Sequence, residues 1–475
     1  MLWRDKMLGT QPFTSQNARR NRFSVLRGAL PIAALSLIAV LCLSAGIEAG
    51  SRGPNPVYTL DQSGVLATYR TDGGVDLANP YFQSLGTNGR SCATCHSAKD
   101  AWTVAPRDIQ NRFFNSQGLD PIFRPVDGAI CPSADVSTVA ARKSAYRLLL
   151  NKGLFRISIA IPSPRDFDIT AIQDPYNCSQ TTAANPALYR RPLPATNLGF
   201  VSAVMWDGRE TVNSGSTINL DASLSSQAFD ATMGHAQAST PPTAEQIAQI
   251  VAFEKANFTA QAADVRAGVL TADGAQGGPK NLAQQPFHIG INDAFGNDPS
   301  GAKFNPNVFT LFSQWANSPS VYRQSVARGE ALFNTYPIAI KGVGGLSDMQ
   351  GTCTTCHDSP NVGNHSFSVP LNIGTSDYPA HAGLDISGLP VYSVTCSDGT
   401  QKQVTDLGRA MISGHCADVG KVKGPILRGL AGRAPYFHNG SAASLADVVE
   451  FYDQRFSLNL TEQQKADLVA FLQSL

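Results

Sequence analysis

The sequence predicts a mostly α-helical fold made of two tandem domains, and three observations support this prediction. The chain has 475 residues, which is too long for a single hydrophobic core of ordinary size. The motif Cys-x-x-Cys-His occurs once in each half, at residues 92–96 and 353–357. Each motif is followed by a similar amphipathic segment, at residues 243–254 and 461–472. A motif and a helix repeated in the same order indicate a duplicated unit.

The first 49 residues carry the features of a secretory signal. Several arginines precede an apolar run from Ala29 to Leu43, and small residues follow up to Ala49. The run is shorter than the roughly 20 residues that a membrane-spanning helix needs. The pattern therefore predicts a signal peptide over residues 1–49 that is removed after export to the periplasm. An uncleaved membrane anchor is the alternative.

The two Cys-x-x-Cys-His motifs predict covalent attachment of two c-type haems. In each motif two thiols on adjacent turns can add across the vinyl groups of the porphyrin, and the histidine becomes the proximal iron ligand. A zinc site would need a second thiol pair near each motif, which the sequence lacks; a redox disulfide is the other alternative. The predicted haem-binding residues are Cys92, Cys95, His96, Cys353, Cys356 and His357.

Helix signals accompany both motifs. Thr243 and Thr461 are each followed three residues later by glutamine, which is the pattern of a capping box at a helix start. Apolar residues then recur at helical spacing in both segments. Residues 325–333 predict another helix ahead of the second motif. A haem motif with a similar late helix in each half is the layout of two cytochrome c-like domains.

These signals set the predicted domain boundaries. The first haem domain covers residues 50–265, a connection covers 266–320, and the second haem domain covers 321–475. The connection is rich in Gly, Pro, Asn and Asp and shows no sustained period, as expected for a long surface segment. The first domain also contains the strand-like stretch Phe155–Ile161, which predicts a small β insertion.

The remaining cysteines predict disulfides. Of nine cysteines, Cys42 lies in the predicted signal and four lie in the haem motifs. An even number is left, which suits an oxidising compartment. Proximity in the sequence favours Cys131–Cys178 and Cys396–Cys416 among the three possible pairings. After residue 49 the chain carries 31 basic and 34 acidic residues, a balance that gives no support for nucleic-acid or membrane-surface binding.

Three further segments are specific when taken together. One contains Trp206-Asp-Gly-Arg209 and continues with Leu224-Ser-Ser-Gln227-Ala. The others are Lys423–Arg428 and residues 434–452, which include the sequence Pro-Tyr-Phe-His at 435–438. With the haem motifs, they resemble the bacterial di-haem cytochrome c peroxidase and MauG family. The resemblance runs from about residue 80 to the C-terminus, interrupted by insertions.

The resemblance implies a division of labour between the haems. The first haem would react with hydrogen peroxide, and the second would move electrons from a small donor protein such as a cytochrome c or a cupredoxin. Trp206 matches the tryptophan that relays electrons between the haems in this family; core packing is the alternative role. The resemblance leaves open a homodimer and a calcium ion between the domains, where Arg433 replaces the family's usual threonine at one carbonyl position.

The sixth ligand of the second haem departs from the peroxidase pattern. The family places methionine fourteen residues after the histidine of Pro-Tyr-Phe-His, and the same offset from His438 gives Tyr452. A tyrosine there resembles the MauG-type enzymes, and a phenolate would lower the iron potential relative to a thioether. Plain packing of Tyr452 on a helix stripe is one alternative, and ligation by Met411 is another.

The peroxide side of the first haem departs as well. Breaking the O–O bond needs an acid/base group that moves a proton from one oxygen to the other. The family's glutamate, ten residues after the glutamine matched by Gln227, becomes Gln237, which cannot titrate, while His235 lies two residues earlier. His235 could be the acid/base group, an iron ligand or a surface residue. Glu210 is a reserve candidate.

The sequence therefore predicts an enzyme, a periplasmic di-haem peroxidase that reduces hydrogen peroxide with electrons from a small donor protein. The first alternative is a MauG-like oxidase that uses peroxide to modify a protein or an organic substrate. The second is a non-catalytic electron-transfer cytochrome, which would need both irons to be six-coordinate.

Overall fold

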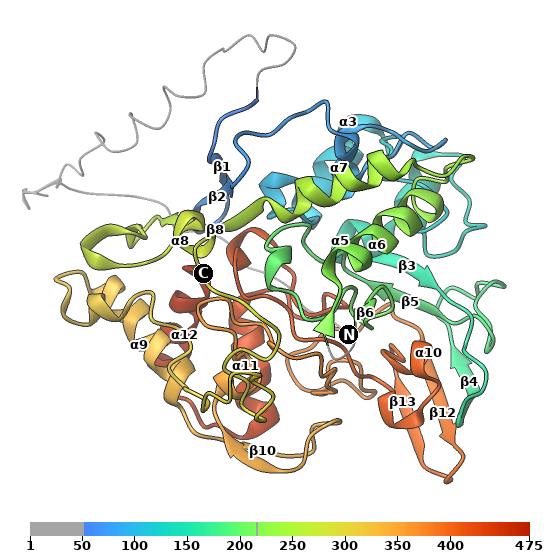
Figure 1. The fold of residues 1–475 in the computed structure, drawn as a ribbon. Helices are drawn as coiled ribbons and strands as arrows, with labels where there is room; N and C mark the ends of the chain where they lie inside the picture. Colours follow the sequence, from blue (N-terminus) through green and yellow to red (C-terminus); the bar gives the residue numbers. More distant parts are fainter. Residues whose placement is uncertain (1–51, 215–216) are drawn as a thin grey trace, which may run out of the picture. The chain divides into compact units, whose positions relative to one another are not determined.

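The computed structural model of the chain describes residues 52–214 and 217–475. The predicted signal peptide, residues 1–49, lies outside the described residues. The described residues belong to one packed unit that ends at Leu475 (Figure 1). Its division into two haem domains joined by a connection stays a prediction.

Short strands and helices alternate up to the end of the first predicted domain. They are β1 (Val57–Leu60), β2 (Gly64–Arg70), the 3₁₀ turn η3 (Pro80–Phe82), α2 (Cys92–Cys95), α3 (Pro106–Ser116), α4 (Val139–Ala145), α5 (Arg147–Lys152), β3 (Phe155–Ser158), β4 (Phe167–Gln173), β5 (Ala187–Arg190), β6 (Asn213–Ser214), β7 (Thr217–Ile218), α6 (Leu220–Gly234), α7 (Ala244–Lys255) and β8 (Asn257–Asp264).

The later part of the chain adds further helices and strands. They are β9 (Gly268–Val269), α8 (Pro279–Leu282), α9 (Val321–Thr335), β10 (Ile338–Ile340), β11 (Met349–Gly351), the 3₁₀ turn η8 (Cys353–Thr355), β12 (Val391–Cys396), β13 (Gln401–Val404), α10 (Ala410–Ser413), α11 (Leu445–Phe456) and α12 (Glu462–Gln473).

The structure confirms the predicted helices and their caps. Thr243 and Gln246 form a complete capping box at the start of α7, and Thr461 and Gln464 do the same for α12. The helix predicted at 325–333 is the centre of α9. In the first half, however, the early element packed against α7 is only the short turn η3. The phenol of Tyr81 in this turn lies 4.5 Å, centroid to centroid, from the ring of Phe253 in α7.

Sheets contribute more than the predicted insertion in the first half. The order β1-β2-β8-β9 gives one antiparallel sheet, and β3 pairs with β5. The sheet β13-β12-β4 joins strands from both halves, with Val391 opposite Gln173 and Cys396 opposite Phe167 (Figure 1). Strands of the second half complete this sheet, because β4 pairs with β12, more than 200 residues away in the sequence.

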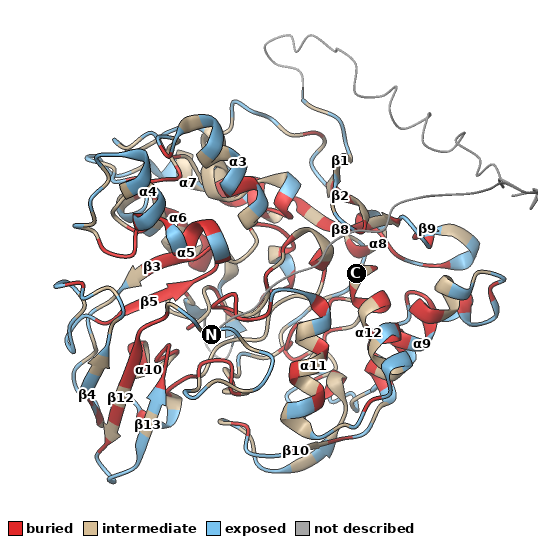
Figure 2. Ribbon diagram, turned by 180° about the vertical axis from the view of Figure 1, so that it is seen from behind, coloured by how far each residue is buried: buried red, intermediate tan, exposed pale blue. Residues whose placement is uncertain are grey.

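The largest apolar core lies where α9, α11 and α12 meet (Figures 1 and 2). Aromatic residues of the connection, Phe309, Phe312 and Trp315, complete it. The crossing of α9 and α12 is close at Gly329, where a Cβ would come within 2.0 Å of the Asp467 carbonyl oxygen. Asp467 is also tied to α9 by a hydrogen bond from the Ser325 hydroxyl (2.5 Å) and an ion pair with Arg328 (2.8 Å).

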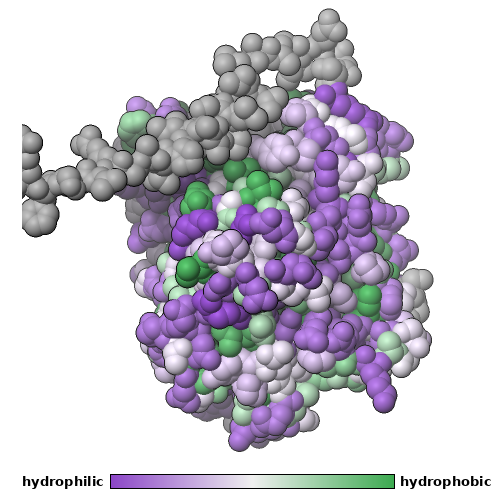
Figure 3. Space-filling model, turned by 90° about the vertical axis from the view of Figure 1, so that its left-hand side faces the viewer, coloured by the Kyte–Doolittle hydropathy of each residue, from purple (hydrophilic) through white to green (hydrophobic). Residues whose placement is uncertain are grey.

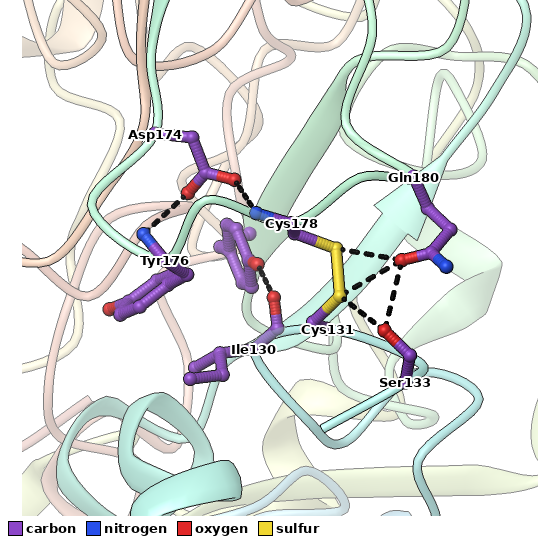
Figure 4. Close-up of a disulfide and its surroundings, with 8 residues drawn as sticks. Ile130, Cys131, Ser133, Asp174, Tyr176, Cys178 and Gln180 are labelled. Atoms are coloured by element: carbon purple, nitrogen blue, oxygen red, sulfur yellow. Dashed lines mark hydrogen bonds between the residues drawn. A yellow bond between two sulfur atoms is a disulfide. The ribbon is translucent and has the colours of Figure 1, made fainter. Parts of the chain in front are cut away.

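Both predicted disulfides are present, Cys131–Cys178 and Cys396–Cys416. Figure 4 shows the first, where the carboxylate of Asp174 accepts hydrogen bonds from the backbone N–H groups of Tyr176 and Cys178, each at 3.0 Å. The second fastens the end of β12 to the segment after α10. The four haem-motif cysteines, by contrast, form no disulfide with any described residue.

The face drawn in Figure 3 is mainly hydrophilic, with apolar residues scattered in small groups. Within residues 52–214 and 217–475, no helix has the length and apolar character needed to cross a bilayer.

Gly329→Ala is expected to lower the free energy of unfolding by about 1–3 kcal/mol, because the added methyl group forces α9 away from the backbone of α12. Gly234→Ala is the matched control, since a Cβ at that helical position meets nothing within 4 Å and alanine has the higher helix propensity. Urea unfolding of both variants checks this, and equal stability of the two would contradict the close crossing.

Candidate functional site

The first Cys-x-x-Cys-His motif opens onto a large cavity. Ser91 and Thr94 cap the short helix α2, which holds the two thiols at the cavity wall. The space not filled by protein atoms measures about 1680 Å³, part of it open to solvent. Its lining includes six residues predicted from the sequence, namely Cys92, Cys95, His96, Trp206, Gln227 and His235. The fold therefore brings together the haem motif and all three predicted catalytic residues.

The orientation of His96 suits an axial ligand. Its Nδ1 lies 2.9 Å from the carbonyl oxygen of Trp102, and because a carbonyl only accepts, Nδ1 carries the hydrogen. Nε2 is then left with a free lone pair, as metal ligation by a histidine requires. Burial lowers the pKa of His96, opposed by the Trp102 carbonyl, and the nearby His235 lowers it further. The two imidazoles therefore lie close to each other at one cavity.

The charges around the cavity fit a ligand with carboxylate groups. Burial lowers the pKa of Arg191 and of Arg433 to about 10 and that of Lys423 to about 8. Within the described ranges none of these three cations has a carboxylate partner; their hydrogen bonds run to backbone carbonyls. Uncompensated buried cations are costly, and the propionates of a haem would neutralise them. The residues present thus fit the porphyrin as well as the iron.

His235 is held by a buried carboxylate. Its Nδ1 lies 2.6 Å from a carboxylate oxygen of Asp127, and Arg90 donates to both oxygens of the same carboxylate at 2.7 and 2.8 Å. Burial would raise the pKa of Asp127, but the contacts with His235 and Arg90 outweigh it and lower the pKa. His235 itself is half-exposed, at 48% of its side chain, so it can exchange protons with solvent.

The neighbouring polar residues have different positions. Gln227, on α6, borders the cavity. Gln237 is exposed and accepts a hydrogen bond from Asn88. Glu210 is outside the lining and accepts a hydrogen bond from Ser226 at 2.8 Å.

Sequence reasoning missed two acidic residues of this site. Asp127 gave no signal, because it meets His235 across 108 positions of the chain. Glu254 lines the cavity with one carboxylate oxygen unpartnered, and burial raises its pKa to about 8. Its position in an amphipathic helix with a capping box resembled that of a solvent-facing residue.

Trp206 is fixed in a turn between the cavity and the second half of the chain. The preceding residue, Met205, has φ of +67°, a left-handed conformation that is uncommon without glycine. The indole N–H donates to the carbonyl of Arg191 at 2.8 Å, and the indole ring lies 6.1 Å from the imidazole of His438, centroid to centroid. The Trp206 carbonyl accepts from the backbone N–H of Lys423 at 2.9 Å.

The second motif repeats the arrangement of the first. Thr352 and Thr355 form the capping box of η8. The Nδ1 of His357 lies 2.6 Å from the carbonyl oxygen of Gly363, so Nε2 is again left free to bind iron. Burial lowers the pKa of His357 to about 4, which keeps the imidazole neutral as ligation needs.

Tyr452 lies beside this motif, whereas Met411 lies elsewhere. Burial raises the pKa of Tyr452, and the neighbouring thiols of Cys356 and Cys353 raise it further. Among the described residues, the phenol oxygen makes no hydrogen bond, although its ring stacks on Phe456 at 6.1 Å. Met411 is 1% exposed and lies in a separate apolar core, which contains neither Cys353 nor Cys356.

No family profile matches the chain. It is 29% identical over 186 residues to cytochrome-c peroxidase IdrP1 of Denitromonas iodatirespirans, which covers 34% of this chain and 44% of that protein. It is 34% identical over 137 residues to cytochrome-c peroxidase IdrP2 of the same organism, covering 26% and 36%. The IdrP1 of Pseudomonas sp. (strain SCT) is 31% identical over 186 residues, covering 34% and 43%. The chain therefore spans less than half the length of these relatives.

A solved structure of a MauG-like protein associated with microbial copper homeostasis aligns with 91% of this chain and 95% of its own. Sequence identity is 16% and the TM-score is 0.38, too low to establish a common fold.

Two covalently bound haems per chain are expected in the mature protein. Replacing both Cys92 and Cys95 with alanine should leave one haem, because the thioether bonds at the first motif can no longer form. Replacing Cys131 and Cys178, which form a disulfide, is the control and should leave two. Intact-mass spectrometry checks this, and two haems in the Cys92/Cys95 variant would contradict the assignment.

Proposed function

We propose that the protein is a periplasmic di-haem peroxidase that reduces hydrogen peroxide with electrons from a small donor protein such as a cytochrome c or a cupredoxin. The observation that carries the proposal is the pair His235–Asp127, held at the same cavity as His96. The similarity to curated cytochrome-c peroxidases supports it. The first haem domain would be the peroxidatic one and the second would pass electrons to it.

His235 has the position and the partner of an acid/base group. Reduction of peroxide consumes two electrons and two protons and releases two water molecules. When bound, haem supplies the electron transfer to oxygen. With Nδ1–H directed at Asp127, Nε2 of His235 can take the proton from one peroxide oxygen and return it to the other. Asp127 fixes the ring and stabilises the imidazolium that forms, and Arg90 keeps Asp127 ionised.

Gln227 and Trp206 take supporting roles. The amide of Gln227 can donate to an oxygen of the substrate from the wall formed by α6. Trp206 touches the cavity on one side and residues of the second half on the other, which is where an electron relay between the two haems belongs. Its hydrogen bond to Arg191 fixes the indole without using the ring face.

Tyr452 favours a second candidate function, a MauG-like oxidase that uses peroxide to modify a protein or an organic substrate. Its raised pKa means that the phenol stays protonated unless a cation lies beside it. Ferric iron at the second motif would supply that charge, and the phenolate would lower the iron potential. A low potential suits storage of oxidising equivalents better than ordinary electron entry. Steady-state oxidation of a reduced c-type cytochrome by peroxide separates the two functions.

His235→Gln is expected to slow the reaction of the haem-loaded protein with hydrogen peroxide by about 10²–10⁴-fold, since glutamine cannot carry the proton. His288→Gln is a matched control, because His288 is also 48% exposed and faces a carboxylate, Asp298, but lies outside the cavity. Stopped-flow absorbance measures both rates. An unchanged rate in His235→Gln would remove His235 from the mechanism.

Trp206→Phe is expected to leave the reaction with peroxide intact and to slow oxidation of the second haem by at least about tenfold, because phenylalanine is much harder to oxidise than an indole. Trp315→Phe is the control, since Trp315 is buried in the α9–α12 core. Rapid-mixing spectra that resolve the two haems give the rates. Equal inter-haem transfer in the two variants would return Trp206 to a packing role.

Tyr452→Phe is expected to change the ligation of the second haem while changing stability by only about 1 kcal/mol or less, because the ring volume is kept. The second haem should lose its low-spin signal in electron paramagnetic resonance and become high-spin, or it should bind a substitute ligand. In either case its reduction potential should rise. Met411→Leu should change neither property. If Met411→Leu changes both the signal and the potential while Tyr452→Phe changes neither, methionine is the ligand. That result would favour the peroxidase over the MauG-like oxidase.

A further inference from the structure

Next to the second haem motif, two carboxylates and an imidazole converge in a fully buried position. Asp293 comes from the connection, Asp358 directly follows His357, and His365 lies on the next turn of the same loop. They are 1%, 0% and 3% exposed. One ligand atom from each lies within 4.8 Å of the other two.

Each carboxylate uses one oxygen for the loop and leaves the other unpaired. Asp293 Oδ2 accepts hydrogen bonds from the backbone of Phe295 and Asn297, and Asp358 Oδ1 accepts one from the backbone of Ser366 at 2.6 Å. In the described part of the chain the other oxygens, Asp293 Oδ1 and Asp358 Oδ2, have no hydrogen-bond partner of good geometry. Both unpaired oxygens face the imidazole.

The imidazole is also unpaired. Among the described residues neither nitrogen of His365 makes a hydrogen bond of good geometry, although Nδ1 lies 2.9 Å from Asp358 Oδ2 and Nε2 lies 3.8 Å from Asp293 Oδ1. Two atoms that bind one ion at about 2.1 Å lie roughly 3–4 Å apart. Each separation is therefore one that a nitrogen and an oxygen bound to a single ion can have, although the two involve different nitrogens and one ion binds only one of them.

Charge leads to the same conclusion. Two carboxylates bring two negative charges into the interior, and in the described part of the chain no lysine or arginine pairs with either. A protonated histidine would cancel only one charge, and an uncompensated buried charge is costly. A divalent cation cancels both.

We propose that Asp293, Asp358 and His365 bind a divalent transition-metal ion of the Zn²⁺ or Mn²⁺ type. Imidazole nitrogen together with carboxylate oxygen suits these ions better than Mg²⁺ or Ca²⁺, which prefer oxygen alone. Only one nitrogen of His365 binds the ion, together with one oxygen from each carboxylate.

Hydrogen bonds from neighbouring segments hold the backbone around these three residues in place. The side chain of Asn292 donates to the carbonyl of Asp358 at 3.0 Å, and the backbone N–H of Gly290 donates to the carbonyl of Ser366 at 3.0 Å. The hydroxyl of Ser202, four residues before Trp206, donates to the carbonyl of His365 at 2.9 Å. The ion would therefore fasten the connection to the loop that follows His357 and to the segment that leads to Trp206.

Elemental analysis of the full-length, haem-loaded protein tests this proposal. Protein purified without a chelator or histidine tag should contain, beside two haem irons, one equivalent of Zn²⁺ or Mn²⁺. After treatment with dipicolinate, titration with either ion alone should restore one equivalent and raise the melting temperature. Failure to take up either ion at millimolar concentration would overturn the proposal.

Variants locate the ion. Asp293→Asn and His365→Gln should each weaken binding at least tenfold while haem content stays at two. Asp298→Asn is the matched control, because Asp298 lies in the same loop but both its oxygens already accept hydrogen bonds; it should keep the metal. Uptake that is undiminished in both test variants would place the ion elsewhere and also overturn the proposal. If one variant fails to fold, the other and the parent's stoichiometry still decide.

Discussion

The arrangement of the site depends on one buried ion pair network centred on Arg190. The guanidinium, 1% exposed, contacts Asp207 at 2.5 Å and Asp406 at 2.7 Å. Asp207 follows Trp206 in the turn at the cavity, and Asp406 belongs to the second half of the chain. Removing one partner of a buried pair leaves an uncompensated charge that costs several kcal/mol. The turn that carries Trp206 therefore cannot move away from the second half, which fixes the indole between the first cavity and His438.

A second constraint comes from charges that the polypeptide alone does not balance. Arg191, Arg433 and Lys423 are cations whose hydrogen bonds, within residues 52–214 and 217–475, all go to backbone carbonyl groups. Their depressed pKa values express the cost of that burial. A bound porphyrin would add carboxylates beside these three cations. The haem is thus expected to contribute to the stability of this region as well as to its chemistry.

The sequence allowed prediction of features whose cause is local. The capping boxes of α7 and α12 need residues only three positions apart, and the disulfides follow from proximity along the chain. Contacts between distant segments leave no comparable trace. The pairing of β4 with β12 depends on strands more than 200 positions apart, and Asp127 reaches His235 across 108 positions. The candidate site shows a related division: the first haem motif and the residues named from sequence motifs, Trp206, Gln227 and His235, line one cavity, whereas their acidic neighbours Asp127 and Glu254 gave no signal.

The two histidine–carboxylate pairs near the haem motifs show how environment separates similar chemistry. At His235 the single carboxylate is already balanced by Arg90 and the ring is half-exposed, so gain and loss of a proton at Nε2 leave no buried charge unpaired. At His365 the ring is buried between two carboxylates that have no lysine or arginine partner among the described residues, so a proton alone leaves a net negative charge in the interior. The first arrangement suits proton transfer to a substrate that enters and leaves. The second suits a fixed divalent cation, and its place behind His357 puts that charge where it would bear on the second haem.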